Sequence, residues 1–285
     1  MGLEVEVVGE TNKFDVICIG GGIAGMTASS IVTQSGLKSC FLEKDVPGGK
    51  LMHIDTIHNF SQPNISGKDL GLSIFKQSTE EVKTSYVYGD VQTIKPKNGL
   101  FYLFTADGQT WEAKALIICV GTGIKRLNID GEDKYFNHGL SYCVMCDAAI
   151  AKDKMAALIG QTNNLEYLKK FASKVDIYQP SDIKSVEGDG SKVTGLIKND
   201  GSKVVCDFVF VENGYESNLN FLPSDIKLDA KQQLIVDDKM ASPYFEGVFG
   251  CGDCINKEPK MIQPAMQQAA IAANSAIKYV KSKHW

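Results

Sequence analysis

The stretch GGGIAG, residues 20–25, decides the fold of this chain. It follows residues 14–19, a short apolar run that predicts a buried parallel strand, and it opens an Ala- and Ser-rich segment that predicts a helix over residues 23–34. Glycines between such a strand and helix let the backbone approach a diphosphate, whose charge the helix N-terminus favours. Glu43, at the end of the next predicted strand, can bind a ribose 2′-hydroxyl. These features favour adenine-dinucleotide binding over a merely tight strand–helix turn.

The rest of the chain predicts an α/β protein with two Rossmann-like domains, the second inserted into the first. Further helices are predicted over residues 68–84, 163–173 and 264–281. Further strands are predicted over residues 38–42, 86–94, 100–105, 110–112, 115–120, 155–160, 175–178, 192–196, 204–211 and 247–251. Residues 155–178 have the order of a second strand–helix–strand unit.

The turn of this second unit lacks the glycines of the first. It reads GQTNN at residues 160–164, so that only Gly160 remains. Without the second glycine, a side chain stands where a diphosphate needs bare backbone. We therefore expect the second nucleotide-binding fold to be degenerate.

Two cysteines with two residues between them, Cys143 and Cys146, precede Asp147. Thiols at this spacing can close a small disulfide and reopen it with little backbone movement, and the acid could move the proton that such an exchange needs. The spacing alone is equally compatible with a structural pair or half of a zinc site. A second such pair, Cys251 and Cys254, is interpreted as buried core thiols in preference to a zinc site or an auxiliary disulfide.

The composition excludes several classes of protein. The net charge of −4 lacks the positive excess typical of nucleic-acid-binding proteins, and no apolar run reaches the roughly 18 residues of a membrane span. The N-terminus has no apolar signal-peptide region. We therefore expect a cytoplasmic protein with neither a nucleic-acid nor a membrane partner. Eight cysteines in such a chain favour redox or metal chemistry over a secreted disulfide framework.

Taken in order, the motifs of this chain resemble those of the low-molecular-weight thioredoxin reductases over most of its length. The matching pieces are GGGIAG (20–25), Glu43, PGG (47–49), Asn59, VGTG (120–123), SYCVMCDA (141–148), CGD (251–253) and QPAMQQAA (263–270). The resemblance implies FAD as the cofactor, with a binding site formed by Gly20, Gly22, Gly25, Glu43, Gly49, Asn59, Gly121, Asp253, Gln263 and Ala265. Asp253 would meet the ribityl chain, and residues 263–265 the flavin pyrimidine.

The same resemblance implies the domains and the roles of the thiols. The FAD-binding domain would comprise residues 1–124 and 242–285, and a central domain would comprise residues 125–241. Cys146 would be the flavin-proximal thiol, Cys143 the thiol that attacks thioredoxin, and Asp147 the proton donor. Ala148 replaces the glycine usual in the family. A homodimer is expected, with hinges near residues 122–126 and 240–243 that let the disulfide alternate between flavin and thioredoxin.

The central domain departs from the family's NADPH-dependent members, which carry a glycine-rich fingerprint and a later cluster of arginines. Arg126 is the only arginine in the chain, and residues 178–185 offer only Lys184. The resemblance thus narrows to the ferredoxin-dependent flavin thioredoxin reductases, in which two reduced ferredoxins would each supply one electron. An NAD(P)H-dependent thioredoxin reductase is the alternative, and a non-catalytic redox-sensing or zinc-holding protein is a further one. The C-terminal residue, Trp285, could stack on the flavin, although a frayed C-terminus is the favoured expectation.

Overall fold

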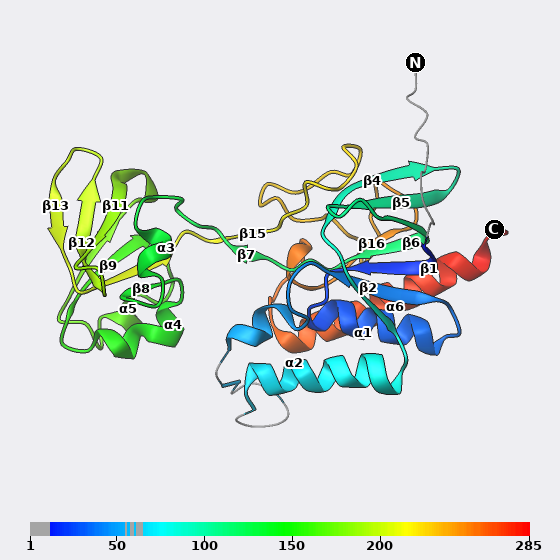
Figure 1. Cartoon of the computed structure of the whole chain (residues 1–285), viewed down its shortest axis with the longest axis horizontal. Helices are drawn as coiled ribbons and strands as arrows, with labels where there is room; N and C mark the ends of the chain where they lie inside the picture. The colour runs from blue at the N-terminus through cyan, green and yellow to red at the C-terminus, as the bar shows by residue number, and fades with distance from the viewer. Residues whose placement is uncertain (1–11, 55, 58–59, 61–64) are drawn as a thin grey trace, which may run out of the picture. The chain divides into compact units, whose positions relative to one another are not determined.

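The computed structural model describes residues 12–54, 56–57, 60 and 65–285 (Figure 1). The chain forms two compact units. The first contains the chain up to Thr122 and again from Glu216 onward, and the second contains Gly123–Tyr215. No helix in these described ranges is long and apolar enough to cross a membrane.

The first unit is built on a seven-stranded mixed sheet. Its strands run in the order β3 (Ser85–Tyr88), β2 (Ser39–Glu43), β1 (Asn12–Ile19), β6 (Thr110–Ile118), β5 (Leu100–Thr105) and β4 (Val91–Lys97), and β16 (Val248–Gly250) also pairs with β6. Strands β3, β2, β1, β6 and β16 pair in parallel. Strand β5 pairs antiparallel with both of its neighbours, β4 and β6. Residues 16–18 of β1 are fully buried, which confirms the predicted central strand.

Helices α1 (Ile23–Gln34), α6 (Ile262–Ser282) and α2 (Gly67–Lys76) lie along one side of this sheet (Figure 1). A wider helical turn, residues 77–81, continues α2. Helices α1 and α6 pack closely because the buried faces carry small side chains, which allow two backbones to approach. These side chains are Ala24, Ala28, Ala269, Ala272, Ala273 and Ala276.

Two strand predictions in this unit needed revision. The predicted strands 110–112 and 115–120 are a single strand, β6, which serves both the parallel and the antiparallel part of the sheet. The predicted strand 86–94 is instead two strands, which separate at Gly89. The Gly89 amide bonds to the carbonyl of Glu43, and this bond ends β3 before the chain joins the antiparallel part.

The second unit contains two small sheets. One is parallel, in the order β10 (Lys174–Tyr178), β9 (Met155–Gly160), β14 (Phe208–Glu212) and β8 (Leu140–Ser141), and the other is antiparallel, with β11 (Ile183–Gly188), β12 (Val193–Lys198) and β13 (Lys203–Val205). Three one-turn helices accompany them: α3 (Glu132–Tyr135), α4 (Val144–Asp147) and α5 (Leu165–Leu168).

Helix α5 is much shorter than the helix predicted over residues 163–173. Beyond Leu168 the backbone bonds elsewhere: Asp153 donates to the carbonyl of Phe171, and Ser173 donates to the carbonyl of Lys154. Tertiary hydrogen bonds therefore override the helical pattern of this segment.

Residues 216–241 belong to the first unit, whereas the sequence analysis assigned them to the central domain. Their buried apolar side chains lie in the core of the first unit: Leu219, Phe221, Ile226, Leu234, Val236 and Met240. Residues 240–243, where a hinge was expected, are bound in this unit, since the Met240 carbonyl accepts the Gly250 amide at 2.9 Å. The chain instead passes between the units at β7 (Gly123–Ile124) and β15 (Tyr215–Glu216), which pair with each other.

Candidate active site

The glycine turn between β1 and α1 combines two crowded glycines with one open one. Gly20 has a φ of +110°, and a Cβ there would lie 2.4 Å from the Cys119 carbonyl oxygen; a Cβ on Gly25 would lie 1.9 Å from the carbonyl oxygen of Gly20. Both glycines are therefore required by the turn. Gly22, the residue that caps α1, has no atom within 4 Å of its Cβ position. The backbone is thus bare where a diphosphate would approach the helix N-terminus.

Glu43 is fixed beside this turn by two backbone amides. Its Oε2 accepts from the Gly21 amide at 2.7 Å, and its Oε1 accepts from the Asp45 amide at 2.8 Å. An ionised carboxylate accepts about four hydrogen bonds, so that acceptor capacity remains for ribose hydroxyls. Sequence reasoning placed Glu43 correctly at the end of β2, next to the glycine turn.

Two further loops close around Gly22. The Gly48 amide donates to the Gly21 carbonyl at 2.8 Å, and a Cβ on Gly49 would lie 3.5 Å from the Cα of Gly22. Gly121 has a φ of +66° and open space at its Cβ position. The predicted residues Gly20, Gly22, Gly25, Glu43 and Gly49 are therefore brought together by the fold. Asn59 lies outside the described residues.

Asp253 is engaged by a lysine that the sequence analysis did not single out. Lys50 Nζ lies 2.7 Å from Asp253 Oδ2 and 2.6 Å from Thr122 Oγ1, so that one cation joins three loops. Its position directly after the PGG stretch was the only sequence signal. Ala265 is buried in the first turn of α6, and Gln263 lies two residues before it.

These residues fit an adenine dinucleotide that carries a flavin. The open Gly22 at a helix N-terminus suits the diphosphate, and the anchored Glu43 suits the adenosine ribose. A carboxylate and an ammonium group, on Asp253 and Lys50, suit the hydroxyl-bearing part of such a cofactor.

The second unit carries the redox turn, residues 141–147. Cys143 is disulfide-bonded, and the side chain of Cys146 is outside the described part of the chain. Ser141 Oγ donates to Asp147 Oδ2 at 2.6 Å and accepts from the Cys143 amide at 3.0 Å. The Asp147 amide in turn donates to the Cys143 carbonyl at 3.1 Å. The turn thus holds the predicted acid and thiol on one short hydrogen-bonded loop.

A buried carboxylate anchors the residue before the disulfide. Glu132 is 3% exposed and accepts from the Tyr142 hydroxyl at 2.7 Å and from the amides of Leu127 and Asn128 at 2.8 and 2.6 Å. Arg126 Nε donates to the Tyr142 hydroxyl at 3.1 Å. Burial, aided by the bond to Glu132, raises the pKa of Tyr142 to about 12. The phenol therefore stays neutral and donates over the physiological pH range.

The degenerate loop, residues 160–164, lies next to the end of β14. A Cβ on Gly160 would lie 2.2 Å from the Glu212 carbonyl oxygen, so that this glycine is retained for the turn itself. The side chain of Thr162 lies beside the Glu212 carboxyl, whose pKa is raised by burial. A hollow of about 500 Å³ borders the loop, and only the single helical turn of α5 follows it.

The remaining cysteines are buried in the core. Cys251 and Cys254 are fully buried free thiols, as the sequence analysis favoured, and Cys18, Cys40, Cys119 and Cys206 are also free and buried. In the portion of the chain that the structure describes, no group of three or more His, Cys, Asp or Glu residues could hold a metal ion.

Trp285 does not lie at the first turn of α6, where the flavin residues are. Its ring packs edge-on against Tyr279 with centroids 5.9 Å apart, and its Nε1 donates to the Val280 carbonyl at 2.7 Å. Because α6 has 21 residues, its two ends are about 30 Å apart. This position does not support stacking of Trp285 on a flavin at the first turn of α6, which was one of our sequence-based hypotheses.

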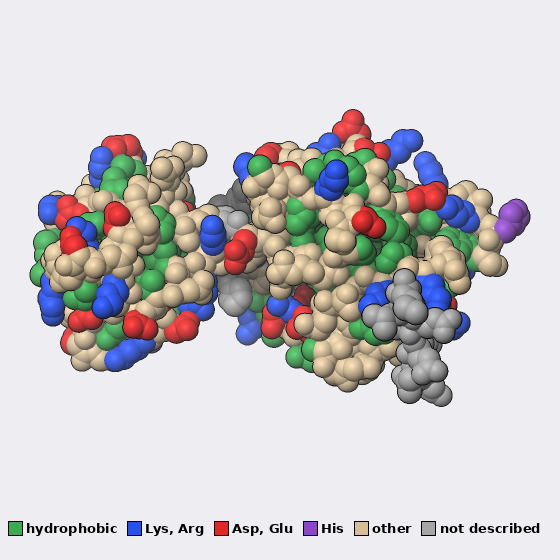
Figure 2. All heavy atoms as spheres, turned by 90° about the horizontal axis from the view of Figure 1, so that it is seen from above, with side chains coloured by type: hydrophobic (Ala, Val, Ile, Leu, Met, Phe, Trp, Pro, Cys, Tyr) green, Lys and Arg blue, Asp and Glu red, His purple; other side chains and the backbone are tan. Residues whose placement is uncertain are grey.

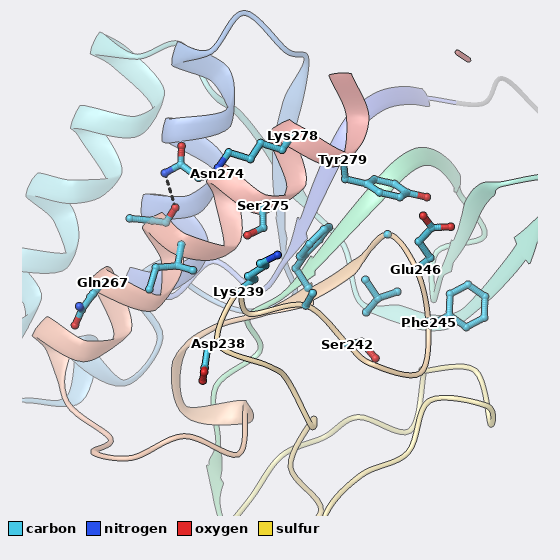
Figure 3. Close-up of a pocket in the computed structure, with 16 residues that line it drawn as sticks. Asp238, Lys239, Ser242, Phe245, Glu246, Gln267, Asn274, Ser275, Lys278 and Tyr279 are labelled. Carbon is cyan, nitrogen blue, oxygen red and sulfur yellow. Dashed lines mark hydrogen bonds between the residues drawn. The ribbon is translucent and has the colours of Figure 1, made fainter. Parts of the chain in front are cut away.

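A larger hollow, of about 690 Å³, lies between α6 and the loop of residues 238–249 (Figure 3). Asn274, Ser275 and Lys278 of α6 line one side of it, and Ser242 and Phe245 line the other. None of the predicted site residues lines this hollow. It is therefore separate from the glycine turn.

Comparison with known proteins agrees with this geometry. A family model described as pyridine nucleotide-disulphide oxidoreductase matches residues 14–163 and 161–269. A thioredoxin reductase from Borreliella burgdorferi is 30% identical over 279 residues, which is 85% of each chain. The crystal structure of Lactococcus lactis thioredoxin reductase has a TM-score of 0.75 at 26% identity and covers 95% of this chain and 100% of that one. A ferredoxin-flavin thioredoxin reductase from Clostridium acetobutylicum has a TM-score of 0.60 at 25% identity, with 95% and 99% covered.

A dinucleotide-binding fold with a separate disulfide-bearing unit defines a flavin-dependent disulfide oxidoreductase. Its cofactor is FAD, which the loops around Gly22 fit. The chain belongs to the thioredoxin reductases of the pyridine nucleotide-disulphide oxidoreductase family.

Proposed function

We propose that this thioredoxin reductase takes its electrons from reduced ferredoxin and not from a pyridine nucleotide. The electrons would pass through FAD to a Cys143–Cys146 disulfide and on to thioredoxin.

The observation that carries the proposal is the content of the degenerate loop. Thr162 stands at the position of the second glycine of a dinucleotide fingerprint, and its side chain lies beside the carboxyl of Glu212. A carboxylate at this place repels a diphosphate and competes for the donors that would bind it. The one-turn helix α5 also offers little of the aligned backbone dipole that favours phosphate at longer helices.

A solved ferredoxin-flavin thioredoxin reductase of similar length supports the same donor. It is 25% identical to this chain and is covered over 99% of its own length. The Lactococcus lactis thioredoxin reductase described above carries no donor in its name. A protein donor must dock on the surface, where Lys and Arg side chains are interspersed with Asp and Glu in the view of Figure 2.

The residues of the redox turn have distinct roles in this proposal. FAD, when bound, supplies the chemistry that collects two single electrons and delivers them as a pair. With two electrons and two protons, the Cys143–Cys146 disulfide becomes two thiols. The Cys143 thiolate then attacks the disulfide of thioredoxin, and Cys146 displaces the reduced thioredoxin as the enzyme disulfide re-forms. Asp147, held by Ser141, moves the protons.

An assembly of two copies is part of the proposal, because the family resemblance implies a homodimer. Sedimentation of the FAD-loaded protein measures it directly. One chain has a mass of 31.0 kDa, and a species of twice that mass is expected.

The alternative donor is NADPH or NADH. It is favoured by the family description, which names a pyridine nucleotide, and by the match of that family model across residues 161–269. Gly160 also keeps the backbone conformation of a dinucleotide turn, with a φ of +106°.

Thioredoxin reduction with each donor in turn tests the proposal. Purified FAD-loaded protein is given oxidised thioredoxin with reduced ferredoxin, with NADPH, or with NADH, and the new thiols are counted. We expect turnover only with ferredoxin. Cys143→Ser should abolish transfer to thioredoxin while reduction of the flavin by ferredoxin persists. Equal turnover with NADPH would establish the alternative.

A further inference from the structure

The side chain of Glu212 links the degenerate loop to the redox turn. Glu212 ends β14 directly beside Gly160, which ends the parallel strand β9, and its carbonyl accepts the Gln161 amide at 3.2 Å. The carboxyl ends of neighbouring parallel strands are the edge at which open α/β sheets bind ligands. In this unit a protein carboxyl group stands at that edge.

A backbone amide holds the Glu212 carboxyl group in place. Oε1 accepts from the amide of Val144 at 3.2 Å, and the side chain of Thr162 lies beside the same carboxyl group. Val144 is fully buried and is the residue that directly follows Cys143. The Glu212 side chain therefore reaches the peptide bond of the reactive cysteine from a different strand of the sheet.

This contact complements the local bonds of the redox turn. The bonds from Ser141 and Asp147 join residues within the turn, whereas Glu212 lies 68 residues from Val144 in the sequence. A bond from a distant strand fixes the turn relative to the sheet, which local bonds do not achieve.

We propose that Glu212 is a positioning residue of the redox turn: its carboxylate holds the Val144 amide, and its negative charge opposes formation of the Cys143 thiolate. Glu212 would then set how strongly the turn favours its disulfide form and how reactive Cys143 is at neutral pH. The inference rests on the part of the proposed function that makes Cys143 the reactive thiol, and it does not depend on which donor reduces the flavin.

Other charged groups near the turn leave this effect in place. Asp147 lies on the turn itself and is bound to Ser141. Helix α5, which packs on α4, carries Glu166 and Lys169, and these two pair with each other at 2.8 Å. An added negative charge beside a thiol raises the thiol pKa, and its removal lowers it.

The test compares Glu212→Gln, which keeps an oxygen acceptor and removes the charge, with Glu212→Ala, which removes both. Glu187→Gln, at an exposed position of the same unit, is the matched control. Each is made in FAD-loaded protein carrying Cys146→Ser, and alkylation of Cys143 is followed against pH by mass spectrometry. In protein with both cysteines, the fraction of disulfide is measured in buffers of known redox potential without ferredoxin or NADPH.

We expect Glu212→Gln to lower the pH midpoint of alkylation by about 0.5 to 2 units, on the order of the effect of one nearby charge in surroundings between water and protein. Glu212→Ala should also shift the midpoint of the disulfide titration relative to Glu212→Gln, because the turn loses its anchor as well as the charge. Midpoints and disulfide fractions in Glu212→Gln equal to those of Glu187→Gln would overturn the inference. Because neither measurement uses an electron donor, that result would leave the ferredoxin proposal unaffected. Likewise, failure of ferredoxin as a donor would leave the Glu212 inference unaffected.

Discussion

The hydroxyl group of Ser141 joins the amide of Cys143, at 3.0 Å, to the carboxylate of Asp147, at 2.6 Å. A disulfide-bonded cysteine, a carboxylate and the hydroxyl that contacts both are therefore contained in residues 141–147. This contact shows how one short turn can hold the proposed proton carrier, Asp147, close to the proposed reactive residue, Cys143.

Replacement of this acid should slow thiol exchange more than replacement of the serine. Asp147→Asn removes the proton carrier, so that thioredoxin reduction should fall by about 10²-fold or more. Ser141→Ala removes one hydrogen bond to a charged group, and a loss of about tenfold is expected. Steady-state rates with saturating donor measure both. Ser181→Ala, on the surface of the same unit, should retain the parent rate, and an Asp147→Asn variant as fast as Ser181→Ala would refute the role of the acid.

The glycine turn separates binding of FAD from stability of the fold. Gly22→Ala places a methyl group in open space at the N-terminus of α1, so that the apoprotein should fold normally while its affinity for FAD falls by about tenfold or more. Gly25→Ala places its Cβ against the Gly20 carbonyl, and this variant should lose stability of the fold itself. Thermal unfolding of the apoprotein and FAD titration by fluorescence distinguish the two. Full FAD affinity in Gly22→Ala would contradict the assigned diphosphate position.

The buried phenol of Tyr142 predicts a pH dependence of stability at high pH. Its pKa is raised from 10.0 to about 12 in the folded chain. Between these pH values the folded chain keeps a proton that the unfolded chain has lost. The stabilising contribution is thus complete below about pH 10 and disappears as the pH rises towards about 12.

We therefore expect Tyr142→Phe to lose less stability than the parent over this pH interval, by about 2 to 3 kcal/mol. Urea unfolding at several pH values measures the difference. Tyr88→Phe is the control, because Tyr88 is 67% exposed. Parallel curves for the parent and Tyr142→Phe would show that the Glu132 bond does not hold the phenol proton.

The sequence predicted the elements whose cause is local. The glycine turn and α1 follow from backbone conformations that particular residues favour, and Gly20, which opens the turn, has a positive φ. Helix α1 has the predicted bounds, Ile23–Gln34. Glu43 could be placed because it ends a strand at a fixed distance from the glycines.

Features that depend on distant partners were not predictable in this way. Residues 216–241 have little regular structure, so that only the packing of side chains such as Phe221 and Leu234 assigns them to the first unit. Lys50 gave no signal beyond its position after residues 47–49, since its partners Thr122 and Asp253 are distant in the sequence. Glu212 reads as the end of an apolar strand, and only the fold brings its carboxylate to Val144.

Anaerobic reduction of the FAD-loaded protein, followed by the absorbance of the flavin, distinguishes directly between ferredoxin and a nicotinamide nucleotide as the electron donor. Reduced ferredoxin and NADPH are added separately in rapid mixing, with the redox turn intact. We expect rapid and complete bleaching with ferredoxin and no bleaching with NADPH or NADH on the same timescale. Rapid, complete bleaching by either nicotinamide nucleotide would contradict ferredoxin as the electron donor.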